Sequence, residues 1–180
     1  RPELVQAMGA RLTGIIRTSP IRTTIDFIRS NGGTVLDENS AIIDQSQGVI
    51  RAAELGYRHI AVTVASFNSD HIDKIRAAEK AKGLEVAILS ICNTCAGETD
   101  VKRILAGADI VCASASTLVR ERIGPRALMQ LGVAIPVFAL TNQGKRLLLS
   151  YLMEFGEQLV AFRTKKMPYI VEGMGPRPRA

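Results

Sequence analysis

Three segments of the sequence place a basic residue in the first turn of an expected helix, shortly after a hydroxyl side chain. The pairs are Ser19 with Arg22, Ser116 with Arg120, and Thr141 with Lys145. A cation at this position opposes the helix dipole by about 0.3–1 kcal/mol. However, a helix N-terminus, a hydroxyl and a cation together are what binding a phosphate or a carboxylate requires. The recurrence of this pattern predicts an anion site built from two or more of these segments.

Further polar side chains are expected to line the same site. Ser66 and Asn68 follow an expected strand and would orient the ligand by hydrogen bonds, and Asn142 directly follows Thr141. Helix capping is the alternative, because Ser, Thr and Asn side chains satisfy the first free N–H groups of a helix. Capping explains most of these residues but leaves the cations unexplained, so both interpretations stay open.

Three cysteines form the second candidate site. Cys92 and Cys95 have the C-x-x-C spacing at the end of one expected strand, and Cys112 lies near the end of the next. If these strands are neighbours, the thiols converge at one edge of the sheet, which suits zinc or an iron–sulfur cluster with one position open. His71 is the candidate fourth ligand. The alternatives are a dithiol–disulfide cycle at the C-x-x-C pair and thiols that simply pack as small apolar groups.

Sharp nucleotide-binding and hydrolase motifs are absent from the sequence. No strand leads into G-x-G-x-x-G, and neither G-x-x-x-x-G-K-[ST] nor G-x-S-x-G occurs. Asp37 and Glu38 are carboxylates suited to acid–base work, but adjacent side chains point apart, and a turn is the simpler interpretation. An enzyme using the anion pocket, such as a lyase or a transferase, would need Asp37 or His71 to turn into it.

The elements that must position these residues follow from an apolar periodicity that alternates between 2 and 3.6 residues. Six short segments rich in Val and Ile are typical of parallel strands that are covered on both faces. They comprise residues 12–17, 34–36, 59–64, 85–91, 110–113 and 136–140.

Helical patterns occupy the intervals between these strands. They comprise residues 20–29, 45–55, 70–82, 100–106, 117–123, 125–131 and 143–155. Ser19, Asp44, Ser69 and Thr99 are the expected N-caps, and glycines follow several of the helix ends. The last helix carries Leu148, Tyr151, Leu152 and Phe155 on one stripe and is expected to pack on the sheet.

Strands that alternate with helices imply right-handed crossovers and a parallel sheet. We therefore expect an α/β fold, a three-layer sandwich with a mostly parallel, Rossmann-like sheet of about six strands. Residues 1–160 form a single α/β domain, and residues 161–180 form a basic tail rich in Pro and Gly. Ligands of such sheets bind beyond the carboxyl ends of the strands, which is where the anion-site and cysteine residues fall.

The composition is that of a folded globular protein. Of the 180 residues, 47% are apolar and 22% are charged, enough for a core without disulfide or metal staples. The longest apolar runs are too short to span a bilayer, and no leader peptide opens the chain. The odd number of cysteines, three, argues against a disulfide framework and favours the cytoplasm.

Most of the net charge of +6 resides in the tail, where five basic residues stand against one acidic residue from Arg163 onward. Such a tail is expected either to be solvated or to lie against a partner, such as an acidic protein surface in a larger complex. Nucleic-acid binding is not expected, because the chain has no recognisable motif and only 4% aromatic residues.

Four stretches of the sequence carry a resemblance to a known family. They are PELVQAMGARLTGIIRTSPI, IDQSQGVIRAAELGYRHIAVTVAS, IVCASASTLVRE and ALMQLGVAIPVFALTNQGKRLLL, in order through most of residues 2–149. Together they resemble methanogenesis marker protein 8, a domain of unknown function. That family has an upstream segment, so this chain looks like its C-terminal region. The C-N-T-C segment departs from the family pattern, which leaves Cys112 as the only thiol that the resemblance supports.

The resemblance implies a cytoplasmic protein found with methane metabolism, one that assists maturation of methyl-coenzyme M reductase or a related cofactor. It implies no established reaction and no catalytic residue. We therefore expect an accessory protein of anaerobic one-carbon metabolism that binds an anionic small molecule at the carboxyl edge of the sheet. The alternatives are an enzyme using the same pocket, a metal or iron–sulfur carrier through the cysteines, and an assembly subunit. The assembly subunit would dock through the basic tail or through whatever precedes Arg1.

Overall fold

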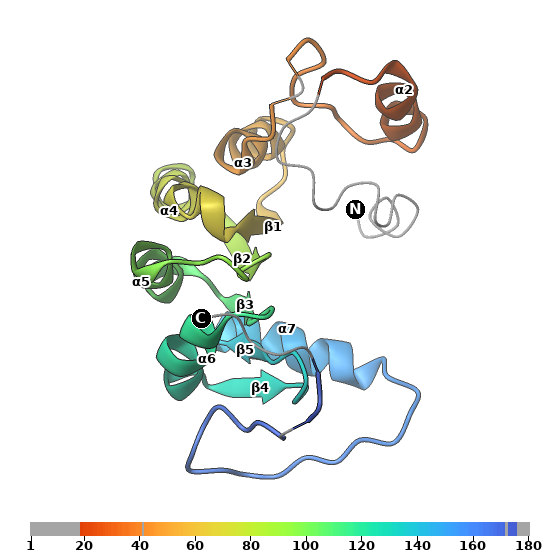
Figure 1. Ribbon diagram of the computed structural model, residues 1–180. Coiled ribbons are helices and arrows are strands. Elements are labelled where there is room, and N and C mark those ends of the chain that lie inside the picture. Colours follow the sequence, from red (N-terminus) through yellow and green to blue (C-terminus); the bar gives the residue numbers. More distant parts are fainter. Residues whose placement is uncertain (1–18, 41, 172, 176–180) are drawn as a thin grey trace.

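The computed structural model describes residues 19–40, 42–171 and 173–175 (Figure 1). The first expected strand, over residues 12–17, lies outside this part of the chain. Two helices come first, α2 (Arg22–Ser30) and α3 (Gln45–Glu54). Helix α2 follows Ile21, so the expected start at Pro20 with Ser19 as the cap is wrong. Helix α3 has its expected cap, because the Asp44 side chain accepts a hydrogen bond from the backbone N–H of Gln47.

Residues 34–36 do not form the expected strand. They run directly into a turn in which the Asp37 carboxylate accepts hydrogen bonds from the backbone N–H groups of Asn39 (2.8 Å) and Ser40 (3.2 Å). The Ser40 hydroxyl, followed by these backbone donors, lowers the pKa of Asp37 below its usual value. The carboxylate is thus part of a turn, which is the simpler of the two interpretations drawn from the sequence.

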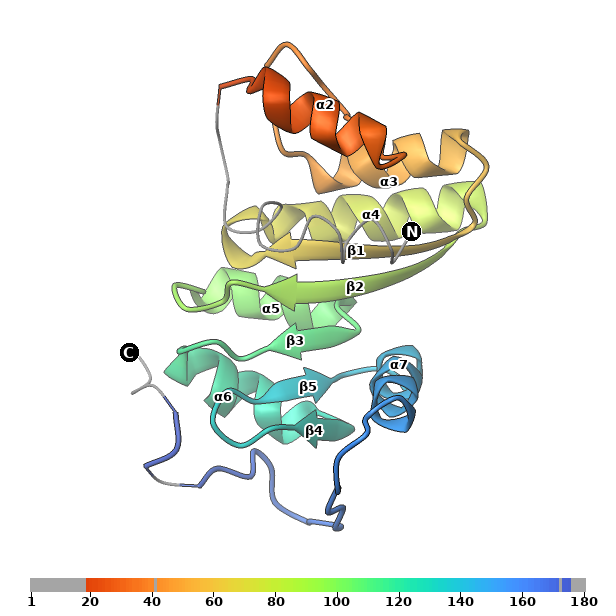
Figure 2. The same ribbon diagram turned by 90° about the vertical axis from the view of Figure 1, so that its right-hand side faces the viewer.

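The described strands form one mixed sheet. They are β1 (His59–Ala65), β2 (Glu85–Ile91), β3 (Ile110–Cys112), β4 (Met129–Leu131) and β5 (Val137–Ala139), in the spatial order β1-β2-β3-β5-β4. The pairs β1–β2 and β2–β3 are parallel, whereas β5 is antiparallel to both β3 and β4. Figure 2 shows β1, β2 and β3 pointing one way and β5 the other. The α/β class is confirmed. The expected mostly parallel sheet of about six strands is corrected, because the described chain forms five strands and only two of their four pairs are parallel.

The reversal of β5 originates in the segment that was expected to be a helix over residues 125–131. This segment instead forms a short 3-10 helix, η3 (Gly124–Arg126), followed by β4. Pro125 suits the first turn but lacks a donor N–H, and the backbone N–H of Leu128 bonds to the carbonyl of Ala139 rather than within a helix. A five-residue connection that begins at Gly132 (φ 72°) then joins β4 to β5 as a hairpin, which makes the two strands antiparallel.

The helices are distributed unequally over the two faces of the sheet. Helices α4 (Asp70–Lys82), α5 (Glu98–Gly107) and α6 (Thr117–Ile123) lie with α3 on one face, and α7 (Asn142–Met153) lies on the other (Figures 1 and 2). Helices α4, α5 and α6 each connect a strand to a parallel strand further along the sheet in the same direction. Because such crossover connections are almost always right-handed, the three helices lie on the same face of the sheet. The expected third layer therefore consists, within the described residues, of α7 alone.

Two of the expected caps act differently. Ser69 does precede α4, but its hydroxyl donates to the Asp100 carboxylate (2.7 Å) instead of capping the helix. Thr99 is not the cap of α5, because that helix begins at Glu98 after Gly97. The other oxygen of Asp100 accepts from the backbone N–H of Gly97 (2.9 Å), so one carboxylate joins the starts of two neighbouring helices.

The main core lies between the sheet and the layer of α3 to α6. Its largest fully buried side chains include Phe138, Ile72, Ile75, Ile88 and Ile104. A smaller core, formed by Ile110, Ala139 and Leu148, lies beneath α7. Of the expected stripe on α7, Leu148 is buried but Tyr151 and Phe155 remain exposed. The reason is that α7 runs away from the sheet toward its C-terminal end, as the side view in Figure 1 and the nearly end-on view in Figure 2 show.

Part of the basic tail is docked beside β4: residues 167–169 contact the body of the protein, whereas residues 161–166 are exposed. The side-chain amide of Gln130 donates to the carbonyl of Tyr169 (2.6 Å) and accepts from the backbone N–H of Tyr169 (2.9 Å). Met167 packs against the main core, and a Cβ on Gly124 would lie only 2.9 Å from the ring of Pro168. These contacts hold residues 167–169 beside β4, which is an edge strand of the sheet. Among the helices described, none is long and apolar enough to cross a lipid bilayer.

Candidate functional site

The direction of β5 divides the residues that were expected to form one anion site. Thr141, Asn142 and Lys145 follow β5, and they therefore lie at the edge where β1, β2 and β3 begin. The Thr141 hydroxyl donates to the carboxylate of Asp109 (2.6 Å), the residue just before β3. The expectation that all strand-following segments share the carboxyl edge is thus wrong for these three residues.

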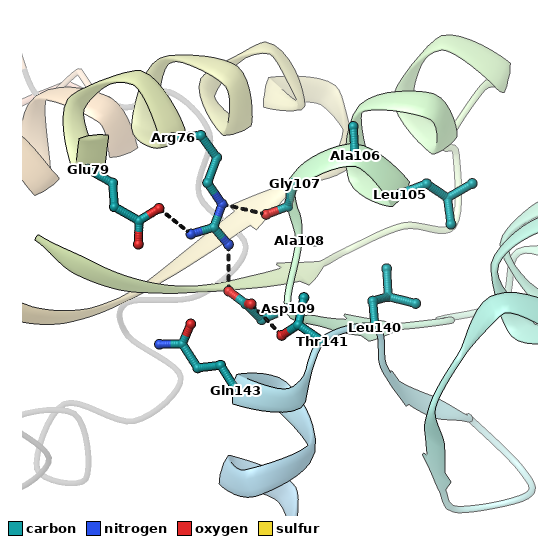
Figure 3. A pocket seen from close by; sticks show the side chains of 10 residues that line it. All are labelled: Arg76, Glu79, Leu105, Ala106, Gly107, Ala108, Asp109, Leu140, Thr141 and Gln143. Atoms are coloured by element: carbon teal, nitrogen blue, oxygen red, sulfur yellow. Dashed lines mark hydrogen bonds and ion pairs between the residues drawn. The ribbon is translucent and has the colours of Figure 1, made fainter. Parts of the chain in front are cut away.

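An ionic network of the buried Asp109 with the half-buried Arg76 and Glu79 occupies this amino edge of the sheet (Figure 3). The guanidinium of Arg76, on α4, donates to the carboxylates of Asp109 (2.6 Å) and Glu79 (2.7 Å) and to the carbonyls of Gly107 (2.9 Å) and Val86 (2.8 Å). The second oxygen of each carboxylate is also used: Glu79 accepts from the backbone N–H of Val86 (2.7 Å), and Asp109 accepts from the Thr141 hydroxyl.

The network lines a cavity of about 410 Å³. Its walls are formed by Arg76, Glu79, Leu105, Ala106, Gly107, Ala108, Asp109, Leu140, Thr141 and Gln143. Burial alone would lower the pKa of Arg76, but the hydrogen bonds to Glu79 and Asp109 and their negative charges outweigh it and raise the pKa. Because two carboxylates share the single cation of this cavity, Arg76 has no charge left for an anion, and the network is suited to joining α4, β2, β3 and α7.

The first expected pair, Ser19 and Arg22, lies away from both edges of the sheet. Arg22 opens α2, which lies beyond α3 (Figure 1). Its guanidinium lies 3.1 Å from the carboxylate of Asp26 and 3.9 Å from that of Glu38. Arg22 is therefore a paired surface cation, and its position does not bring it together with the other expected site residues.

At the carboxyl edge, Ser66 and Asn68 make contacts that hold the fold together. Both belong to the 3-10 helix η2 (Ser66–Asn68) after β1. The Ser66 hydroxyl donates to the carbonyl of Cys92 (3.1 Å), which links the ends of β1 and β2, and the Asn68 amide donates to the Gln45 side chain (3.4 Å). Ser116 is buried and caps α6 by accepting from the backbone N–H of Val119. Thr141 likewise caps α7, because its hydroxyl accepts from the backbone N–H of Gly144 (3.1 Å), so the capping interpretation is correct for both residues.

His71, the candidate fourth metal ligand, lies in the first turn of α4 beside the carboxylate of Asp44. Its Nδ1 atom is buried without a hydrogen-bond partner, 3.5 Å from the Asp44 oxygen. Burial raises the pKa of Asp44, but hydrogen bonds from Ser46 and Gln47, together with the His71 charge, outweigh it, so the pKa lies below its usual value. His71 and Asp44 thus form a histidine–carboxylate pair near the end of β1.

The loops after β2 and β3 are shaped by a buried asparagine that the sequence did not single out. Asn93 is fully buried: its side chain donates to the carbonyl of Cys112 (2.8 Å) and accepts from the Ser90 hydroxyl (3.0 Å), and its backbone N–H donates to the Ser114 hydroxyl (3.1 Å). Cys92 and Ser114 adopt positive φ angles of 53° and 50°, which cost conformational energy outside glycine. Asn93 holds both strained residues in place.

The three cysteines do not assemble into a metal site. Cys92 and Cys95 are exposed and Cys112 is half-buried, with its sulfur 3.9 Å from the Ser114 hydroxyl. The described chain includes every cysteine and histidine of the sequence, and it contains no group of three or more His, Cys, Asp or Glu side chains that could hold a metal ion. The residues present therefore do not fit a zinc ion or an iron–sulfur cluster bound by three thiols.

Arg120 differs from every other cation of the expected site. It lies on α6 and is only 6% exposed to solvent, and one of its terminal nitrogens donates to the carbonyl of Ala134 (3.0 Å). Its Nε atom is buried and unpartnered, and no carboxylate of the described residues lies within 4 Å of it. A buried guanidinium without a counter-ion is destabilising by several kcal/mol. Arg120 is thus the one member of the expected set whose environment calls for an anion.

Fold and site together define an α/β protein with a mixed sheet and a hydrogen-bonded ionic network at the amino edge. At the carboxyl edge lies a buried guanidinium that has no counter-ion among the described residues. The chain belongs to a family described as an uncharacterized protein conserved in archaea (DUF2099), whose model matches residues 1–153. It is 35% identical over 160 residues to an uncharacterized protein of Methanocaldococcus jannaschii, MJ0054. That alignment covers 89% of this chain and 55% of the relative, so the chain spans about half the relative's length. No solved structure gives a significant match.

Proposed function

We propose that this protein binds a small anion, a phosphate or a carboxylate, through Arg120 at the carboxyl edge of β3. The observation that carries the proposal is the burial of this guanidinium without a counter-ion among the described residues. A bound anion would supply the missing charge and a charge-assisted hydrogen bond, each of which is strong where water is excluded. Ser116, one turn before Arg120, and Ser66, which follows β1, are the hydroxyls of the expected set on this edge.

A purely structural role for Arg120 is the competing explanation. Its hydrogen bond to the carbonyl of Ala134 fixes the connection between β4 and β5. However, one hydrogen bond to a neutral acceptor contributes about 1.5–3 kcal/mol when the donor is charged, which does not exceed the cost of burying an unpaired charge. The balance therefore favours a ligand-binding role.

The experiment that tests this proposal is a thermal-shift titration with inorganic phosphate, pyrophosphate and citrate at constant ionic strength. We expect the wild-type Tm to rise with at least one of these anions and the Arg120→Gln variant to show no rise. Arg122→Gln is the matched control, because Arg122 lies on the same helix but is exposed and paired with Glu98 (3.2 Å). Equal shifts in wild type and Arg120→Gln, or no shift with any anion, would overturn the proposal.

We further propose that the protein acts as a cytoplasmic accessory protein of anaerobic one-carbon metabolism. The support is the resemblance of residues 2–149 to methanogenesis marker protein 8, which lies within the region matched by the family model. In this role the anion would be a charged group of a cofactor or of one of its precursors. The thermal-shift panel extends directly to such compounds, with Arg120→Gln again as the negative control.

An enzyme that uses the same edge of the sheet is the second candidate function. One observation favours it: the buried Nδ1 atom of His71 lies 3.5 Å from the Asp44 carboxylate, so a small side-chain movement would form the hydrogen bond that orients a histidine for proton transfer. Asp37, the other titratable group considered, is engaged in its turn. If a lyase or transferase activity is found with an anionic substrate, His71→Gln should lower kcat while leaving the phosphate-dependent Tm shift unchanged.

A further inference from the structure

The connection between α7 and the docked tail carries an unusual concentration of exposed apolar side chains. Of the twenty exposed large apolar residues in the described chain, eleven lie between residues 147 and 174, and four of these belong to the connection itself. The most exposed of the connection itself are Val160 (92%), Phe162 (61%) and Leu159 (51%). Figures 1 and 2 show this segment running outside the layers of sheet and helices. Exposed apolar groups gathered in this way mark an interaction surface.

The segment is anchored at both ends rather than loose. It begins where α7 ends at Met153 and returns to the body where Tyr169 pairs with the Gln130 side chain. The ring of Phe162 packs edge-on against the ring of Tyr169, with 4.9 Å between their centroids. A turn follows, in which the Thr164 hydroxyl accepts from the backbone N–H of Lys166 (3.1 Å). The apolar residues are therefore presented on a defined loop.

The charges that flank these apolar residues are separated by sign. Two exposed carboxylates, Glu154 and Glu157, precede them, and three exposed cations, Arg163, Lys165 and Lys166, follow them. None of these five side chains has an ion-pair partner within 4 Å in the described part of the chain. We call residues 154–166, with their acidic beginning, apolar middle and basic end, the dipolar segment.

We propose that the dipolar segment is a self-association surface that pairs with the same segment of a second copy of this chain. In a two-fold symmetric interface each patch meets itself in the opposite direction. The acidic beginning of one copy then faces the basic end of the other, twice, while Val160 and Phe162 of both copies meet at the centre. The segment is thus complementary to itself in both charge and hydrophobicity.

Other partners fit the segment less well. An anionic lipid surface or a nucleic acid would attract the three cations but would repel Glu154 and Glu157, which lie within a few residues of them. A uniformly acidic protein surface meets the same repulsion. A second copy satisfies both signs, and the exposed α7 residues Tyr151 and Met153 supply further apolar area, since a stable interface buries about 1,200–2,000 Å² in total.

Charge reversal in the full-length protein tests the proposal, with the dimer dissociation constant measured by analytical ultracentrifugation. Lys165→Glu with Lys166→Glu makes the segment acidic at both ends, and Glu154→Lys with Glu157→Lys makes it basic at both ends. Each double variant should raise the dimer Kd by about tenfold or more at low salt, because like charges then face each other. Lys80→Glu with Lys82→Glu, at the exposed end of α4, is the matched control and should dimerise like wild type.

Two ways of combining these variants distinguish the proposed charge pairing from a simple loss of folding stability. An equimolar mixture of the acidic and basic variants should form a heterodimer, and a chain carrying all four reversals should dimerise with itself again. Both recoveries should weaken with added salt as the wild-type dimer does. A monomeric wild type, variants that dimerise as wild type does, or a mixture that stays monomeric would each overturn the proposal. None of these measurements depends on the anion site at Arg120.

Discussion

Removal of the Asp109 carboxylate is the perturbation for which the structure predicts the largest loss of stability. This side chain is almost completely buried and accepts three hydrogen bonds. They come from the Arg76 guanidinium (2.6 Å), the backbone N–H of Ile88 (2.8 Å) and the Thr141 hydroxyl (2.6 Å). The residue thereby joins α4, β2, β3 and the start of α7 at one point.

The magnitude follows from what each partner loses in Asp109→Ala. The Ile88 N–H and the Thr141 hydroxyl lose their acceptors, at about 1–3 kcal/mol for each polar group left buried and unpaired. Arg76 keeps Glu79 and two carbonyls, so its loss lies below the 3–5 kcal/mol typical of a broken buried pair. We expect a net destabilisation of about 4 kcal/mol, a large part of the 5–15 kcal/mol that stabilises a typical domain.

Urea unfolding followed by circular dichroism measures this loss, and a graded series keeps it measurable if Asp109→Ala does not fold. Thr141→Val removes one of the three bonds together with the cap that Thr141 provides to α7, and it should cost about 2 kcal/mol. Asp109→Asn should lie between this variant and Asp109→Ala. Asp73→Ala, which removes an exposed carboxylate 3.7 Å from Arg103, should change stability by less than about 0.5 kcal/mol. A loss below about 1 kcal/mol in Asp109→Ala would refute the role given to the network.

Three further predictions concern other parts of the fold. Gly144→Ala should destabilise by about 1–3 kcal/mol in urea, because its Cβ would lie 2.8 Å from the carbonyl carbon of Asp109, whereas Gly48→Ala, with open space around it, should be neutral or stabilising. Because the pKa of Asp44 is lowered in the folded state, its contribution is present above the unfolded value of about 3.9 and is lost as the pH falls through the folded value; Asp44→Asn should therefore flatten the acid limb of a Tm–pH profile. Arg120→Met should raise the stability of the ligand-free protein by about 1 kcal/mol in urea, because a buried unpaired charge is removed at the cost of one hydrogen bond, and a lower stability would assign the guanidinium a structural role.

Local sequence signals correctly predicted those elements for which the capping residue, the apolar periodicity and the terminating residue indicate the same bounds. Helices α4 and α6 and strand β2 have the predicted bounds, and Asp44 caps α3 as expected. In these cases cap, periodicity and terminating residue all indicate the same structure. Residues 125–131 failed because their apolar spacing suits a helix as well as a strand. Pairing with β5 stabilises the strand β4 here instead of a helix. This contact joins two segments, so the apolar spacing within one of them does not predict it.

The candidate site illustrates the same division. That Arg120, Ser116 and Thr141 stand at helix starts was readable from the chain, and so were the caps that Ser116 and Thr141 supply. Asp109 was missed, although an acidic residue directly before a buried strand was a signal that could have been followed. Asn93 left no comparable signal, because its role depends on three partners from β2, β3 and their loops.

The sequence by itself determined the α/β class, most helices and strands, and the residue types available for binding an anion, because these depend on spacing within a few turns of chain. Only the tertiary structure decided which of those residues meet. The reversal of β5 moved Thr141 and Lys145 to the opposite edge from Arg120. Burial then distinguished three cations that look alike in the sequence, since Arg22 pairs with carboxylates, Lys145 is exposed, and Arg120 is buried with no counter-ion in the part of the chain that the structure describes. Charge pairing and desolvation are properties of surroundings in space, and those surroundings come from segments distant in the sequence.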